Sequence, residues 1–113
     1  MIRRGDIFRL PKTGAVVCLL DTPTSKEPGV NCMVVGGTSQ TYPKGGYDIY
    51  VFVGDLQTAE RVEPGEKQYI VPEQGHPVTD VHKLLTAYQK YHDKKVTWEE
   101  YQRDVGQVAK HYE

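Results

Sequence analysis

The spacing of apolar residues changes once along this 113-residue chain, close to Pro72. Before that point, short runs of β-branched and aromatic residues are separated by turns that contain Gly and Pro, which is typical of a small sheet or barrel. After it, apolar residues recur every three or four positions, which indicates amphipathic helices. The sequence therefore predicts an α+β fold: a small β-barrel or strongly bent antiparallel sheet, followed by a C-terminal helical hairpin.

The β-rich part is expected to contain six short strands. The second is almost continuously apolar, so it is predicted to lie in the centre of the sheet. The fifth is compatible with a strand or with a helical turn, and no other helix is expected before Val71. The expected strands are Ile7 to Leu10, Ala15 to Leu20, Val30 to Val35, Tyr47 to Val53, Thr58 to Val62 and Gln68 to Val71.

Two helices are predicted after Pro72. The first spans Thr79 to Asp93, with Thr79 or Asp80 as its N-cap. The second spans Thr97 to Tyr112 and begins with a capping box, Thr97-Trp98-Glu99-Glu100, while Val96 and Tyr101 stand at the positions of a hydrophobic staple. The two helices are expected to pair and to pack on the sheet through apolar stripes, to which we assign the aromatic residues Tyr88, Tyr91, Trp98, Tyr101 and Tyr112.

The length favours a single domain over residues 1–113, with a β-rich part at 1–72 and a two-helix part at 79–112. The formal net charge is −1, so a nucleic-acid site would have to be local rather than spread over the surface. Cys18 and Cys32 lie in apolar runs and are expected to be buried and reduced. No apolar stretch approaches the roughly 20 residues of a membrane span, and a cytoplasmic location is expected.

Two segments of the first half resemble the MazF/PemK family of small RNA-cleaving toxins. They are the opening Arg3-Arg4-Gly5-Asp6-Ile7 and the Thr38-Ser39 pair, which follows an apolar strand and Gly36-Gly37. The resemblance implies an SH3-like barrel, a metal-independent endoribonuclease that acts on single-stranded RNA, a homodimer and a neutralising antitoxin. The family uses an Arg in a Gly-x-Arg-Pro loop, whereas the corresponding loop here is Pro11-Lys12-Thr13-Gly14.

RNA cleavage without a metal needs one group to remove the 2′-hydroxyl proton, another to protonate the leaving oxygen, and positive charge on the phosphate. Hydroxyls at a Gly-containing turn and one loop histidine are the candidates for proton transfer or phosphate contact. The same hydroxyls are also explained by a turn in which they bond the local backbone. The candidate catalytic residues are Thr38, Ser39 and His76, and the candidate RNA-binding residues are Arg9, Lys12, Tyr42 and Tyr47.

A metal site at His76, Asp80 and His82 lacks an evident fourth ligand, so neither a metal nor another cofactor is expected. Two functions from different classes remain open. The first is a MazF/PemK-like RNA-binding protein or endoribonuclease with an incomplete catalytic set. The second is a non-catalytic SH3-like module that binds a protein partner, such as a regulator or inhibitor encoded by a phage or mobile element.

Overall fold

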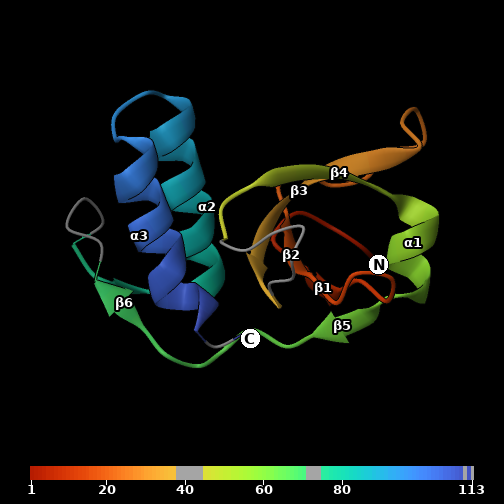
Figure 1. The fold of residues 1–113 in the computed structure, drawn as a ribbon, viewed down its shortest axis with the longest axis horizontal. Coiled ribbons are helices and arrows are strands. Elements are labelled where there is room, and N and C mark those ends of the chain that lie inside the picture. Colours follow the sequence, from red (N-terminus) through yellow and green to blue (C-terminus); the bar gives the residue numbers. More distant parts are fainter. Residues whose placement is uncertain (38–44, 71–74, 111, 113) are drawn as a thin grey trace.

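Five antiparallel strands form a bent sheet in the order β4-β3-β2-β1-β5 (Figure 1). The computed structural model describes residues 1–37, 45–70, 75–110 and 112. The first four strands follow one another as a meander, and the fifth returns to pair with the first. The strands are β1 (Ile7–Arg9), β2 (Val16–Leu19), β3 (Gly29–Gly36), β4 (Asp48–Phe52) and β5 (Glu60–Val62).

The central position of β2 confirms the expectation from its continuous apolar run, and all four of its residues are buried. Where β2 pairs with β3, the register shifts between Val16 and Val17. Such an irregularity increases the local twist and helps the sheet to bend. Within the described residues β4 and β5 remain the two edges of the sheet, so it is strongly bent but not closed into a barrel.

A short helix, α1 (Val53–Thr58), joins the two edge strands, so the expectation of no helix before Val71 is wrong. The strands expected at Tyr47 to Val53 and Thr58 to Val62 are present but shorter, as β4 and β5. The single fully buried residue of α1 is Leu56, and Asp55 lies in its first turn, where a negative charge is favourable. A helix of six residues with one apolar anchor is too short to show a 3.6-residue period. The alternative of a helical turn over Thr58 to Val62 is wrong, because Glu60–Val62 forms strand β5.

A second, two-stranded sheet and two longer helices complete the described structure: β6 (Tyr69–Ile70), β7 (Pro77–Val78), α2 (Asp80–His92) and α3 (Trp98–Ala109). The strand β7 was not expected. Thr79 caps α2, and the capping box at the start of α3 is complete, as predicted. However, α3 ends at Ala109 rather than at Tyr112, although the Tyr112 side chain is still buried.

The two faces of the sheet belong to different hydrophobic cores because neighbouring residues of a strand point to opposite faces. On one face α2 and α3, together with β6 and β7, cover Ile7, Val16, Cys18, Met33 and Val35. The other face lies inside the bend, where α1 contributes Leu56 to a core with Phe8, Val17, Leu19, Val30, Cys32, Val34 and Val51. The α+β class and the packing of the C-terminal helices on the sheet are confirmed. In the described part of the chain, no helix combines the length and apolar character needed to cross a membrane.

Candidate functional site

Three of the candidate residues, Thr38, Ser39 and Tyr42, lie outside the described residues. Arg9 lies at the end of β1, and its Nη1 donates a 3.1 Å hydrogen bond to the Gly14 carbonyl oxygen. The same atom would lie 3.1 Å from a Cβ built on Gly37, which has a positive φ of 55°. The guanidinium therefore stands beside the point at which the chain leaves β3 and enters the segment containing Thr38.

The other candidates are placed on different parts of the molecule. His76 lies in the exposed turn before β7, and one of its ring nitrogens, Nδ1, is 3.1 Å from the Pro77 carbonyl oxygen. That turn belongs to the β6–β7 sheet, which lies beside the helices and away from β1 (Figure 1). Tyr47 contacts Trp98 of α3, with their ring centroids 5.6 Å apart. The described contacts therefore do not bring His76 or Tyr47 to Arg9.

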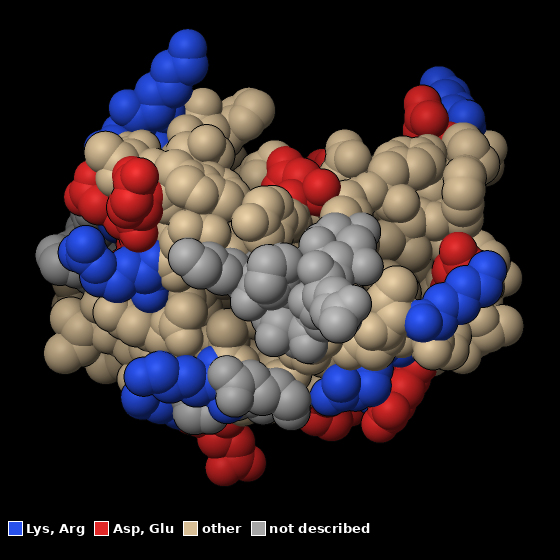
Figure 2. Space-filling model, viewed as in Figure 1, with Lys and Arg blue, Asp and Glu red and all other residues tan. Residues whose placement is uncertain are grey.

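Charged side chains are distributed in separate small groups on the face seen in Figure 2, where Lys and Arg do not form a continuous band. A protein that follows a nucleic-acid backbone over several nucleotides usually presents such a band. This distribution agrees with the net charge of −1. In the described residues, no group of three His, Cys, Asp or Glu side chains could hold a metal ion.

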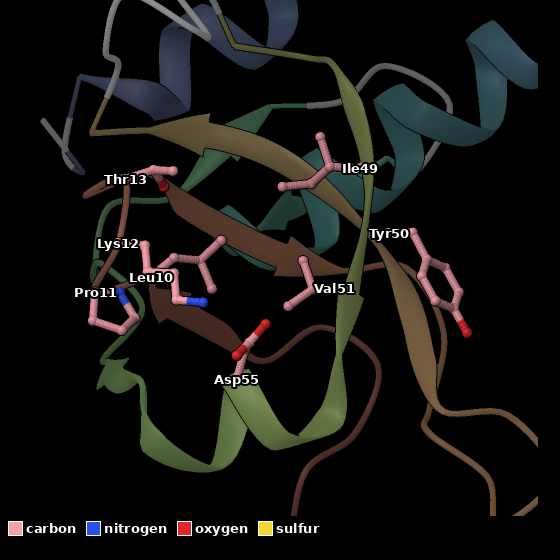
Figure 3. A pocket seen from close by; sticks show the side chains of 8 residues that line it. All are labelled: Leu10, Pro11, Lys12, Thr13, Ile49, Tyr50, Val51 and Asp55. Atoms are coloured by element: carbon pink, nitrogen blue, oxygen red, sulfur yellow. The ribbon is translucent and has the colours of Figure 1, made fainter.

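A small slot opens between β4 and the turn that follows β1 (Figure 3). Leu10 and Val51 form its apolar walls, while Lys12 and Asp55 extend toward the same space from opposite sides. Its volume is about 200 Å³. Because small-molecule sites usually measure about 300–1,000 Å³, this slot suits one side chain better than a whole nucleotide.

The slot lies at the free edge of the sheet. Val34 N–H donates to the Tyr47 carbonyl oxygen at 2.8 Å, and Val53 N–H donates to the Pro28 carbonyl oxygen at 3.0 Å. In an antiparallel pair, alternate residues of a strand bond the same neighbour. The odd-numbered residues of β4 therefore direct their backbone N–H and C=O groups toward β3. The backbone N–H and C=O groups of Asp48, Tyr50 and Phe52 point away from β3.

Two aromatic side chains are exposed along this edge. Tyr50 is 47% exposed and Phe52 is 54% exposed, and their rings meet edge to face with centroids 5.8 Å apart. The Tyr50 hydroxyl accepts a 2.9 Å hydrogen bond from Gly29 N–H, so this ring is held in place. An edge strand is usually protected by charge, by Pro or by a covering segment, because its backbone can pair with another chain. Aromatic side chains beside open backbone groups provide no such protection.

Sequence reasoning did not identify this edge. The run from Tyr47 to Phe52 is rich in strand-forming residues, but propensity does not tell an edge strand from a central one. The signal that was present is its alternation: Asp48, Tyr50 and Phe52 occupy one face, and Ile49 and Val51 occupy the other.

We searched protein-family models, curated proteins and solved structures for similar proteins, and found no match.

Proposed function

We propose that this protein is a non-catalytic binding module that takes up an extended segment of a protein partner along the free edge of β4. The observation that carries this proposal is the position of the slot between that edge and the turn after β1. A strand added to β4 would run over the slot. Main-chain hydrogen bonds would then supply affinity, and side-chain pockets would supply specificity, as in other cases of strand addition.

The size and chemistry of the slot, and the side chains along the free edge of β4, support this function. Alternate residues of an added strand point to the same side, so one of them would enter the slot between Leu10 and Val51. The slot combines an apolar wall with one basic and one acidic group at its rim, Lys12 and Asp55. The exposed Phe52 ring would add contact area beside the bound segment, since aromatic residues contribute large contact areas at interfaces. The Tyr50 ring lies over Gly29 of β3 and contacts the Phe52 ring edge to face.

Phe52 allows a sharp test because its backbone already has the geometry of proline, with φ −70° and ψ 141°. Its N–H points away from β3, so Phe52→Pro removes a donor at the free edge and leaves the β3–β4 pairing intact. Phe52→Ala is the matched control, since it removes the same ring but keeps the N–H. The affinities of both variants for peptides selected from a random display library would be measured by fluorescence polarisation.

We expect Phe52→Pro to weaken peptide binding by about tenfold or more relative to Phe52→Ala. Hydrogen exchange provides the structural readout, because a bound strand should protect the amides of Asp48, Tyr50 and Phe52. Equal affinity of the two variants, or unchanged exchange at these amides, would contradict strand addition. Failure to select any binding peptide would also count against the proposal.

One observation favours RNA binding as a second candidate function. The Arg9 guanidinium lies beside Gly37, next to the Thr38-Ser39 segment that the family resemblance singles out. Polarisation of a labelled single-stranded RNA in the presence of EDTA would test it, and binding should weaken steeply with salt. Arg9→Gln should reduce this binding, whereas Arg103→Gln on the exposed face of α3 should not. Cleavage would be followed in parallel with Thr38→Ala, Lys12→Ala and His76→Ala.

A further inference from the structure

A cleft lies between the beginning of β4 and the turn that joins α2 to α3. Its volume is about 490 Å³, which is within the usual range for a ligand site. Figure 2 shows acidic side chains in the hollow between the helices and the sheet. The cleft is lined by Asp48, Tyr88, Tyr91, His92, Lys94, Val96, Thr97 and Trp98.

Four of the eight lining residues carry aromatic rings, and contacts with neighbouring rings hold them in place. The centroids of Tyr91 and Trp98 are 5.4 Å apart with a tilt of 57° between the ring planes. Tyr91 also stacks on the fully buried Tyr101, at 4.8 Å and 12°. On the other side, Tyr88 stacks on His92 at 5.9 Å and 17°. The cleft thus offers ring faces whose positions are set before any ligand arrives.

Asp48 brings a negative charge to these rings. One carboxylate oxygen, Oδ2, accepts a 3.0 Å hydrogen bond from the Tyr88 hydroxyl. Among the described residues Asp48 forms no ion pair, although Lys94 and His92 line the same cleft. Partial burial raises the pKa of Asp48, and the Tyr88 hydrogen bond and His92 only partly oppose that change. A carboxylate that has lost some of its water and has no ion-pair partner gains from a cation that enters the cleft.

We propose that this cleft binds an arginine side chain of the protein partner. A guanidinium can donate two parallel hydrogen bonds to a carboxylate and at the same time stack on an aromatic face, whereas an ammonium is a point charge without that planar fork. The assignment rests on the proposed strand addition, since Asp48 is the first residue of the β4 edge. A segment paired with β4 would carry its arginine to the cleft at one end of the strand.

The only tryptophan of the chain is Trp98, so indole fluorescence and the indole N–H resonance report on this cleft alone. The probe is N-acetyl-arginine amide, and N-acetyl-citrulline amide serves as its uncharged analogue of nearly the same shape. We expect saturable changes of the Trp98 signals with the arginine probe and at least about tenfold weaker changes with the citrulline probe. Equal responses to the two probes would overturn the proposal.

Three variants separate binding from structural effects. Asp48→Asn should weaken binding of the arginine probe by about tenfold, whereas Glu60→Gln, which removes a charge from the opposite edge strand, should leave it within about twofold. Tyr88→Phe removes only the hydrogen bond to Asp48 and should retain binding. If Tyr88→Phe lost as much affinity as Asp48→Asn, then Asp48 would act by positioning Tyr88, and the assignment would be wrong.

The two proposals fail in different ways. If the arginine probe binds but Phe52→Pro and Phe52→Ala bind selected peptides equally well, the arginine assignment is supported and strand addition is contradicted. If selected peptides protect the β4 amides but the arginine probe leaves the Trp98 signals unchanged, strand addition is supported and the arginine assignment is contradicted. An arginine-containing peptide that binds Asp48→Asn as tightly as the unaltered chain would also contradict the assignment.

Discussion

The Tyr112 hydroxyl donates a 2.8 Å hydrogen bond to Oδ2 of Asp80, which joins the end of the chain to the first residue of α2. Both residues are buried. Gly65 N–H lies 3.1 Å from each of the two oxygen atoms, so a third segment converges on the same point. A Cβ on Gly65 would lie only 2.6 Å from Asp80 Oδ2. These contacts fix the C-terminus and the crossing between β5 and β6 against the helical hairpin.

We expect Tyr112→Phe to lower the free energy of unfolding by about 1–3 kcal/mol, because it removes a hydrogen bond to a buried carboxylate. Tyr91→Phe is the matched control, since the Tyr91 hydroxyl makes no hydrogen bond in the described part of the chain, and its effect should stay within about 0.5 kcal/mol. Urea unfolding followed by circular dichroism would measure both. Equal stability of the two variants would show that the Tyr112–Asp80 hydrogen bond contributes nothing net.

The two cysteines give a test of the cores. Cys18 and Cys32 are free and buried on opposite faces of the sheet, and burial raises the pKa of each thiol to about 12. Because the thiolate is the reactive form, a thiol reagent should label the native protein slowly at neutral pH and rapidly in denaturant. Fast labelling of either cysteine under native conditions would contradict its place in the core.

Elements with strong local signals could be predicted from the sequence. The complete capping box at Thr97 and the apolar stripe of α3 are interactions within one helix, and they need no tertiary information. The central position of β2 followed from an apolar run that had to be buried on both faces. By contrast, α1 and β7 depend on what surrounds them. Leu56 stabilises α1 only because the bent sheet provides a core to receive it.

The candidate cleft could not be predicted for a related reason. Helical spacing assigned Tyr91 and Trp98 to the core, but the structure leaves Tyr91 exposed and Trp98 only partly buried. Helical spacing shows which side of the helix a residue faces, but it does not show how close the neighbouring strand or helix lies on that side. Asp48 comes from a strand far away in the sequence, and only the packing of α2 and α3 beside β4 brings it to these rings. Tyr47, proposed to stack on RNA bases, contacts Trp98.

The turn between α2 and α3 contains the only positive φ of a residue other than glycine in the described structure, 60° at Lys94. Lys95 N–H donates to the Lys90 carbonyl oxygen, and Lys94 N–H donates to that of Tyr91, a pattern that normally has glycine at this position. We expect Lys94→Gly to stabilise the fold by about 0.5–1 kcal/mol. Lys95→Gly, outside the positive-φ position, should not stabilise it. A destabilised Lys94→Gly variant in thermal unfolding would contradict this assignment.

Loss of the capping box at Thr97 should lower the free energy of unfolding. Thr97 Oγ1 accepts from Glu100 N–H at 3.2 Å, and Glu100 Oε1 accepts from Thr97 N–H at 3.1 Å. Thr97→Ala should therefore destabilise the protein by about 1 kcal/mol, whereas Thr24→Ala in an exposed loop should have little effect. Hydrogen bonds from the Thr97 backbone and then its side chain lower the pKa of Glu100. In Thr97→Ala an NMR titration should find that pKa closer to its ordinary value of 4.5.

The pH dependence of stability provides a test of the environment of Asp48. Partial burial raises its pKa above the ordinary 3.8 of an aspartate, against the opposing effects of Tyr88 and His92. The folded state therefore binds this proton more tightly than the unfolded state does. Stability must fall as pH rises from the unfolded value through the folded one. Asp48→Asn removes this loss, so its melting temperature relative to the unaltered chain should rise across that window and stay level above it. A flat Asp48→Asn difference would mean that the Asp48 carboxylate is as well solvated in the folded protein as in the unfolded chain.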